Sequence, residues 1–199
     1  MFYSYKNLKL QINSGEIYAN SIGINCQNQL EPIYLTEQRH SFDYAASDGL
    51  NNSIRLNYYL TGVDPLKTFI QNETSSISGY LGGLAFQTGY LRSYELTAVP
   101  NEPVNVNAEI VFFDELKGLF SPSYEKIVEN NVLNYADATI TLPATNTIGD
   151  LTNATRVSFS FNSDIQTSYE IGKIIPEISF ANKEISAEIE CDNLSGQLA

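Results

Sequence analysis

The sequence predicts a mainly antiparallel β protein with one or two short helices and a second, partial β unit at the C-terminus. Short runs alternate apolar and polar residues between turn residues, which is typical of antiparallel strands. Thirteen Tyr and ten Phe favour strands over helices. Only 17% of the 199 residues are charged, too few for a coiled coil, whereas 43% are hydrophobic and can bury a core.

The alternation predicts strands at residues 8–12, 16–26, 54–60, 79–96, 104–113, 138–142, 156–161, 174–180 and 185–191. Within 16–26 the apolar phase shifts near Asn20, which indicates a turn or a bulge. Glycines at positions 79, 82, 83 and 89 interrupt the aromatic run 79–96 and allow bends or a close approach of another backbone. The small, polar stretch between 142 and 156 is predicted to be an exposed loop.

Two helices are predicted where a capping residue precedes a proline. Asp64 and Pro65 match an N-cap followed by the first helical position, and apolar residues then continue at helical spacing, which predicts a helix over 64–73. Ser121 and Pro122 form a second start of the same kind and predict a helix over 122–132.

The C-terminal part of the chain is similar to an N-terminal segment. Residues 21–34 align with 156–169, and the apolar positions coincide: Ile22, Ile24, Cys26, Leu30 and Tyr34 fall on Val157, Phe159, Phe161, Ile165 and Tyr169. After a one-residue gap, residues 60–62 align with 194–196. This predicts a duplication in which Tyr34 superposes on Tyr169. The chain would consist of a β domain at 1–120, a helical connector at 121–135 and a partial second unit at 136–199 that resembles 20–62.

The charge balance excludes some classes of partner. Eleven Lys and Arg against 23 Asp and Glu give a net charge of −12, which argues against a sequence-independent nucleic-acid binder and against docking on an anionic membrane. The segment that follows Met1 lacks the apolar core of a signal peptide, and no apolar run approaches a membrane span. We therefore expect a soluble protein made in a cytoplasm. Cys26 and Cys191 are interpreted as buried thiols, with a disulfide as the alternative.

No residue is predicted to act in catalysis or to hold a cofactor or metal. His40 lies in a polar stretch without a second His, Cys or acidic cluster at ligand spacing, so we interpret it as structural or solvated. The carboxylate pairs Asp114-Glu115 and Glu188-x-Glu190 are of the type a glycosidase uses across a cleft. Alternation places Glu188 and Glu190 on a solvated strand face instead. We expect the protein not to be an enzyme.

An ordered set of motifs lies in residues 56–120. Leu56-Asn-Tyr-Tyr-Leu-Thr-Gly-Val-Asp-Pro65 is followed by Ser78-Gly-Tyr-Leu-Gly-Gly-Leu-Ala-Phe-Gln-Thr-Gly-Tyr-Leu-Arg-Ser-Tyr94, then by Pro100-Asn-Glu-Pro-Val104 and Ala108-Glu-Ile-Val-Phe-Phe-Asp-Glu-Leu-Lys-Gly118. This order resembles the tail-tube-like virion proteins of tailed bacteriophages. The region after residue 135 matches only through the internal repeat.

The resemblance implies a β-sandwich or half-barrel with a flanking helix, located in the virion tail. It also implies a ring of identical copies, hexameric in number, whose stacked rings conduct DNA out of the capsid. An acidic wall would let DNA pass without sticking, because it repels phosphate. The partners would be other copies, other tail, neck or baseplate proteins, and DNA only in transient, non-specific passage. The incomplete second unit leaves open a major tube protein, a tube-end or neck component, or part of the baseplate hub.

Two groups of residues are candidates for this function. Acidic residues opposite apolar ones on strand faces are candidates for the lumen: Glu16, Glu109, Glu188 and Glu190. The stretch 38–53 is long for a hairpin, and its residues Phe42, Asp43, Tyr44 and Asp48 are candidates for contacts between rings. The alternative function is a β-sandwich carbohydrate-binding or adhesin module, which exposed aromatic residues on a flat sheet would favour. A glycan-degrading enzyme is a third possibility.

Overall fold

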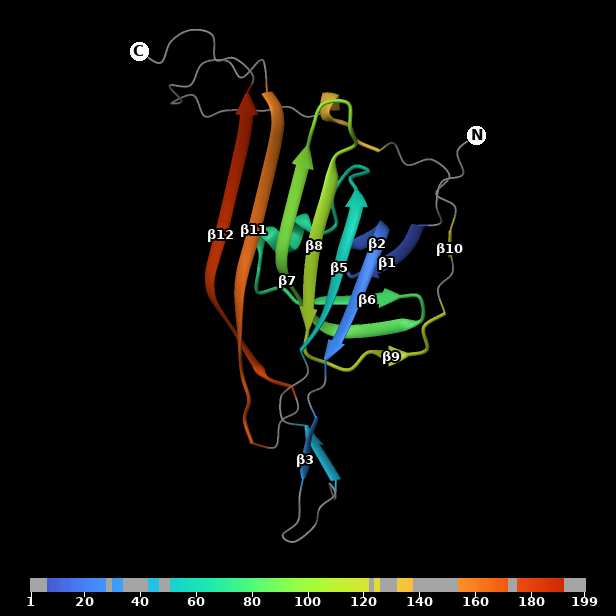
Figure 1. The fold of residues 1–199 in the computed structure, drawn as a ribbon, viewed down its shortest axis with the longest axis vertical. Helices are drawn as coiled ribbons and strands as arrows, with labels where there is room; N and C mark the ends of the chain where they lie inside the picture. The colour runs from blue at the N-terminus through green and yellow to red at the C-terminus, as the bar shows by residue number, and fades with distance from the viewer. Residues whose placement is uncertain are drawn as a thin grey trace.

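The computed structural model describes residues 7–27, 30–33, 43–46, 51–121, 124–125, 132–137, 154–171 and 175–191. Its strands are β1 (Asn7–Ile12), β2 (Gly15–Gln27), β3 (Leu30–Ile33), β4 (Asp43–Ala46), β5 (Asn51–Tyr59), β6 (Ile77–Leu81), β7 (Leu84–Ala98), β8 (Asn105–Phe112), β9 (Lys117–Gly118), β10 (Tyr124–Glu125), β11 (Ala154–Ser168) and β12 (Glu177–Cys191). The helices are α1 (Lys67–Gln71) and the 3-10 helix η1 (Tyr135–Asp137). The predicted mainly β, antiparallel class is confirmed (Figure 1).

Six strands close into a barrel. Their order is β1, β2, β5, β8, β7 and β6, and β6 pairs back onto β1, where Leu10 lies opposite Leu81. The resemblance implied a β-sandwich or half-barrel; the structure instead shows a closed six-stranded barrel with additional strands. Closure depends on β7, whose first half pairs with β6 and whose second half pairs with β8. A closed barrel leaves no unpaired edge at this seam.

Two of the predicted glycines make room for a core aromatic ring. Gly79 of β6 and Gly89 of β7 flank Phe86, and a Cβ atom at these positions would lie 2.5 Å and 2.9 Å from its ring. Phe86 is buried and stacks on Phe112 with 5.2 Å between the ring centroids. The absence of two side chains thus lets this ring lie directly against the backbone.

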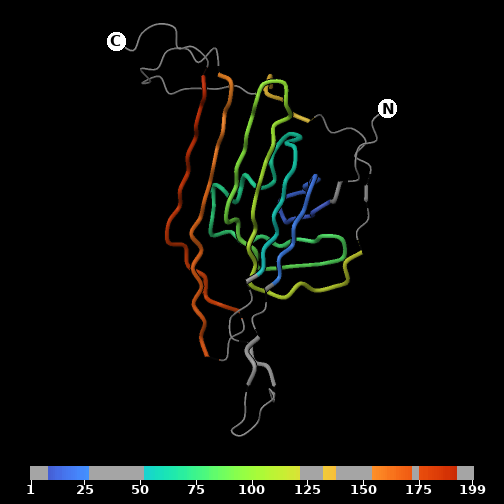
Figure 2. The backbone as a smooth tube through the Cα atoms, viewed as in Figure 1, coloured from blue at the N-terminus to red at the C-terminus, as the bar shows by residue number. Residues whose placement is uncertain are grey.

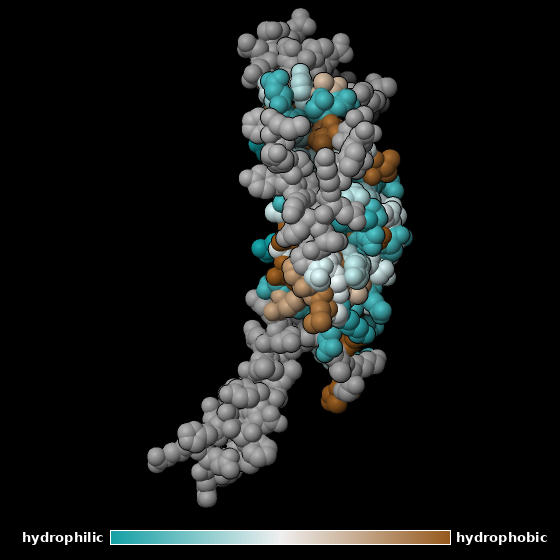
Figure 3. Space-filling model, turned by 90° about the vertical axis from the view of Figure 1, so that its right-hand side faces the viewer, coloured by the Kyte–Doolittle hydropathy of each residue, from teal (hydrophilic) through white to brown (hydrophobic). Residues whose placement is uncertain are grey.

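Alternate strand residues fill the barrel interior, as the period of a half-buried strand requires. Leu10, Ile54, Leu91, Ile110 and Phe112 are among the fully buried side chains. On the side of the molecule that Figure 3 shows, hydrophilic residues separate small exposed apolar patches. In the part of the chain that the structure describes, no helix is long and apolar enough to cross a bilayer.

β11 and β12 extend the barrel wall into a larger sheet. β11 pairs with the second half of β7, from Val157 opposite Ala98 to Asn162 opposite Ser93, and β12 pairs along β11. The result is an antiparallel layer in the order β2-β5-β8-β7-β11-β12, which we call the front sheet. Figures 1 and 2 show these strands running upright, with β12 at the left edge.

The bulge predicted near Asn20 is confirmed. The register between β2 and β5 shifts between Ala19 and Ser21. Before the shift, Ile17 and Ala19 point into the barrel; after it, Ile22 and Ile24 pack against the same core. The extra residue therefore keeps apolar side chains on one side while β2 passes from the barrel seam to the front sheet.

The predicted helices are only partly correct. The first is shorter than expected, because α1 begins at Lys67 and ends at Gln71. The second, predicted over 122–132 within the helical connector, is wrong where it is described: Tyr124 and Glu125 form β10, which pairs with Leu8 and Asn7 of β1. The start of β1 extends beyond its pairing with β6, and its edge there accepts these two residues in place of a helical turn. The other residues of that connector are either irregular, in η1, or outside the described residues.

The C-terminal strands are longer than predicted. β12 runs without the expected break between 180 and 185, and β11 continues to Ser168; between Ser163 and Ile165 the register shifts, because β12 holds one extra residue between Phe180 and Lys183. β11 and β12 share a sheet with the barrel and do not form a separate layer. The strand predicted at 138–142 lies outside the described residues.

The two aligned segments both contain an antiparallel strand pair, β2–β5 and β11–β12. The strand registers in the two pairs differ by one residue. Ile22 lies opposite Leu56, and the alignment matches these two residues to Val157 and Glu190, but Val157 lies opposite Ile189. Tyr34 is outside the described residues, so its superposition on Tyr169 stays a prediction.

Both cysteines are free thiols, and neither is buried. The prediction of buried thiols is therefore wrong. Cys26 lies opposite Asn52 on the side of β2 that faces inward, yet it is exposed, because β1 pairs with β2 only as far as Ala19.

A buried carboxylate joins three parts of the barrel. Asp64 precedes α1 and accepts hydrogen bonds from the Tyr58 hydroxyl of β5 at 2.8 Å and the Tyr94 hydroxyl of β7 at 2.7 Å. It also accepts the backbone N–H of Leu66 at 2.8 Å. The carboxylate thus fixes the turn before the helix and ties it to two barrel strands.

The two tyrosines of this cluster make stability sensitive to alkaline pH. Burial, then the adjacent Asp64 charge, raises the pKa of both Tyr58 and Tyr94 above the ordinary value of 10.0. Their contribution to stability is fully present below pH 10, and is lost as the pH rises, because only the unfolded chain ionises them. Each such tyrosine lowers the free energy of unfolding by up to about 1.4 kcal/mol per pH unit above that point.

This pH dependence can be measured by thermal unfolding between pH 8 and pH 12. We expect Tyr58→Phe and Tyr94→Phe to flatten the loss of stability above about pH 10. Tyr80→Phe is the control, because Tyr80 is 49% exposed. An unchanged slope in the first two variants would contradict the assignment.

Lys183 attaches the β11–β12 hairpin to the helix. Its Nζ donates to the backbone carbonyl of Ile70 in α1 at 2.9 Å, lies 3.8 Å from Oε2 of Glu73, and sits 5.5 Å from the centroid of the Phe161 ring.

We expect Lys183→Met to speed amide hydrogen exchange in β12 about fivefold, equivalent to one lost hydrogen bond, while the barrel strands keep their rates. Lys67→Met, on the exposed side of α1, is the control; equal exchange in both variants would count against the attachment.

Candidate functional site

The outer side of the front sheet is lined by polar residues from all six strands. Strand register places these residues in three rows across the sheet: Gly23, Arg55, Glu109, Ser93, Asn162 and Glu184; Ser21, Asn57, Asn107, Glu95, Ser160 and Ser186; Tyr59, Asn105, Thr97, Ser158 and Glu188. A further pair, Arg156 and Glu190, lies beyond the third row. We call this set the polar face. It exists because each strand alternates polar residues outward with apolar residues inward.

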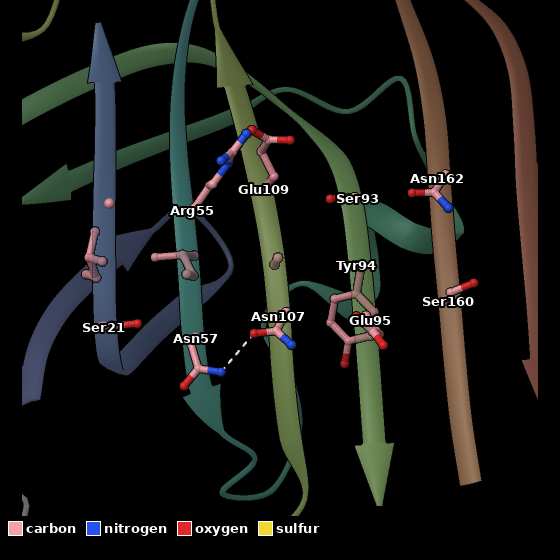
Figure 4. A pocket seen from close by; sticks show the side chains of 14 residues that line it. Ser21, Arg55, Asn57, Ser93, Tyr94, Glu95, Asn107, Glu109, Ser160 and Asn162 are labelled. Atoms are coloured by element: carbon pink, nitrogen blue, oxygen red, sulfur yellow. Dashed lines mark hydrogen bonds and ion pairs between the residues drawn. The ribbon is translucent and has the colours of Figure 1, made fainter.

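The polar face is hollowed. A shallow depression of about 710 Å³ extends from β2 across β5, β8 and β7 to β11. Figure 4 shows Arg55 and Glu109 on neighbouring strands, directed toward one another, and Ser160 and Asn162 on β11 at the far side. An open hollow of this kind fits a broad surface contact better than an enclosed small molecule.

Neutral side chains hold one another across the strands. The Asn57 Nδ2 donates to Oδ1 of Asn107 at 2.8 Å and to Oδ1 of Asn105 at 3.0 Å (Figure 4 marks the first of these). The hydroxyls of Ser160 and Ser186 lie 2.7 Å apart. These bonds use part of the hydrogen-bonding capacity of the face within the sheet, and they fix the side chains in place.

The charges of the polar face are mostly negative. It carries five carboxylates, Glu95, Glu109, Glu184, Glu188 and Glu190, against two guanidinium groups, Arg55 and Arg156, so its formal net charge is −3. Each arginine has an ion pair directly across the sheet: Nε of Arg55 lies 2.9 Å from Oε1 of Glu109, and Nη1 of Arg156 lies 3.4 Å from Oε1 of Glu190.

Three of the four lumen candidates lie together on this face: Glu109, Glu188 and Glu190. Glu16 does not. It pairs with β1, where Lys9 lies 2.9 Å away, and hydrogen bonds from Lys9, Gln11 and Tyr18 lower its pKa. Glu16 therefore lies apart from the other three candidates, because the segment of β2 that carries it pairs with β1, which is not part of the front sheet.

The sequence alone did not single out Glu95, Glu184 or the neutral serine and asparagine residues of the polar face. The signal was present in alternating runs such as Asn105, Asn107 and Glu109, where every outward position is polar. The pairing of β7 with β11, which brings these runs together, joins segments far apart in the chain.

Two of the four candidates for contacts between rings lie in a small separate sheet. Asp43 and Tyr44 lie in β4, opposite Ile33 and Pro32 of β3. Figure 1 shows this pair of strands beyond the lower end of the front sheet. Phe42 and Asp48 lie outside the described residues.

The other residues that the sequence analysis considered for catalysis or metal binding include Asp114 and His40. Asp114 accepts the backbone N–H of Gln87 through Oδ2 at 2.7 Å and so continues the β7–β8 ladder beyond its end. Within the described ranges, no group of three or more His, Cys, Asp and Glu side chains is arranged to hold a metal ion. His40 lies outside those ranges.

The chain matches no model of a known protein family, and no curated protein is significantly similar to it.

Proposed function

We propose that this protein is a structural component of a bacteriophage tail, whose copies form a ring with the polar faces turned toward the DNA channel. The observation that carries the proposal is the front sheet, which combines a hollowed, acidic outer face with an open edge on each side. The resemblance of residues 56–120 to tail-tube-like proteins supports the same assignment.

The open edges belong to β12 and to the second half of β2. In the described part of the chain, no strand pairs with the outer side of β12, and β1 covers β2 only up to Ala19. Because the front sheet has an even number of alternating strands, β2 and β12 run in opposite directions. A neighbouring copy in the same orientation would therefore extend the sheet with a further antiparallel pair, and repeated addition closes a ring.

The inward side of these edges favours the same contact. Ile185 of β12 is 52% exposed, and Ile189, four residues further along the same face of the strand, is half-buried. Ile22 and Ile24 at the other edge are also half-buried. Pairing β12 of one copy with β2 of the next would bring these four side chains into one apolar layer and remove them from water.

The outer face suits a surface past which DNA moves. Its carboxylates repel phosphate, and its serine and asparagine side chains bond to one another across the strands. A carbohydrate-binding module would use exposed aromatic rings as a platform. In the three rows of the polar face, the only aromatic residue is Tyr59, at one corner.

Electron microscopy of the negatively stained protein tests the proposal. We expect rings or short tubes, and light scattering should show association at micromolar concentration. We also expect β3, β4 and residues 38–53 to contact the next ring. Single particles at all concentrations, alone and together with other tail proteins, would overturn the proposal in favour of an adhesin or carbohydrate-binding module.

A further inference from the structure

Both cations of the polar face stand directly opposite a glutamate. Arg55 and Glu109 are register partners between β5 and β8, and Arg156 and Glu190 are register partners between β11 and β12. The other three carboxylates of the face, Glu95, Glu184 and Glu188, have no ion pair within the described residues. The paired and unpaired acids are thus distinct in their surroundings, although they carry the same charge.

We infer that Glu109 and Glu190 act as counter-ions that keep Arg55 and Arg156 from binding the phosphate backbone of DNA. This inference rests on the proposed function, because it concerns the face turned toward DNA. It assigns the two glutamates a role that the overall negative charge of the face does not supply.

The geometry around Arg55 carries the argument. The Arg55 side chain is 75% exposed, whereas the Glu109 side chain is only 16% exposed and is therefore held in place. On the other side of Arg55 lies Gly23, where an added Cβ would meet nothing within 4 Å. Glu109 is thus the only neighbour in this row that offsets the charge of the guanidinium.

Without that neighbour, the guanidinium would be an exposed group of the kind that binds phosphate with two parallel hydrogen bonds. A carboxylate at 2.9 Å competes with phosphate for the same donor. A carboxylate several strands away contributes only a screened, long-range repulsion, because the Debye length is about 8 Å at physiological salt. Position, and not only total charge, then decides whether DNA is retained.

The test compares variants that change the net charge equally. Glu109→Gln and Glu190→Gln each remove one negative charge beside an arginine, and Glu95→Gln and Glu184→Gln remove one at an unpaired position that is not next to either arginine. We expect each of the first two to increase affinity for duplex DNA at physiological salt about tenfold more than the controls, because screening there limits the effect of distant carboxylates. The double variant should bind more tightly still. Its dependence on salt should steepen by about 0.9 in log–log slope for each additional phosphate that an arginine neutralises.

A second substitution ties the increase in affinity to the arginine. Arg55→Gln in the Glu109→Gln background should return DNA affinity to the level of the unsubstituted protein. Equal increases in all four glutamate variants would overturn the inference, because net charge alone would then explain binding. Circular dichroism and thermal melting establish that each isosteric variant is folded. Binding is measured whether or not rings form, so failure of this inference is separable from failure of the ring assembly.

Discussion

Replacing Asp64 with alanine should lower the free energy of unfolding by about 3 kcal/mol. Asp64 is 9% exposed and receives hydrogen bonds from Tyr58, Tyr94 and the Leu66 backbone. The substitution leaves two buried hydroxyls and one buried N–H without their acceptor, and each unsatisfied buried group costs about 1–3 kcal/mol. Chemical denaturation monitored by circular dichroism measures the loss.

The matched control for this prediction is Asp137→Ala. Asp137 also accepts a backbone N–H, from Asn134 at 2.9 Å, but it is exposed, and water can replace the lost bond. We expect a loss of about 0.5–1 kcal/mol there. Losses of equal size in both variants would contradict the prediction, because burial of Asp64 and its partners would then add nothing to the free energy of unfolding.

Replacing Ile185 with lysine should abolish ring formation while leaving the subunit folded. Ile185 points inward from β12 at the open edge and is 52% exposed in the single chain, so lysine is accommodated without burial. In a ring, the same position would lie beside the next copy. Loss of the apolar contact and desolvation of the charge should cost about 2 kcal/mol per interface, which is about a 30-fold weaker contact.

Ile175→Lys serves as the control because Ile175 is 50% exposed and precedes β12. Size-exclusion chromatography with light scattering should show that only Ile185→Lys is monomeric at the concentration at which the unsubstituted protein assembles. Rings formed equally by both variants would mean that this edge of β12 is not the contact.

Local pattern was sufficient to predict most strands and the bulge at Asn20, because alternation depends on neighbouring residues alone. It was insufficient for barrel closure, since the pairing of Leu10 with Leu81 is set by distant contacts. The apolar spacing from Tyr124 onward suited a helix, yet Tyr124 and Glu125 pair with the edge of β1, so tertiary pairing overrides the local preference.

The candidate site could likewise be predicted only where local pattern is sufficient. Glu109, Glu188 and Glu190 were predicted because outward position on a strand follows from alternation. That Glu16 lies apart from these three could not be predicted, because alternation does not reveal which strands a segment joins on each side of a bulge. The ion pair between Arg55 and Glu109 needs the register of β5 against β8, which no single segment contains.

The composition of β12 has a consequence for how whole chains refold. The pairing of β11 with β12, from Ser168 opposite Glu177 to Ala154 opposite Cys191, is more local in sequence than the pairing of β1 with β6 that closes the barrel. A refolding chain can therefore expose the long edge of β12 before the subunit is complete, when wrong pairing is easiest. β12 carries Glu177, Glu184, Glu188 and Glu190 against the single Lys183, so two β12 strands repel each other. Residues 20–27 of β2 carry no charge, so they do not repel β12 in this way. The charges of β12 therefore disfavour its pairing with another β12 relative to its pairing with β2.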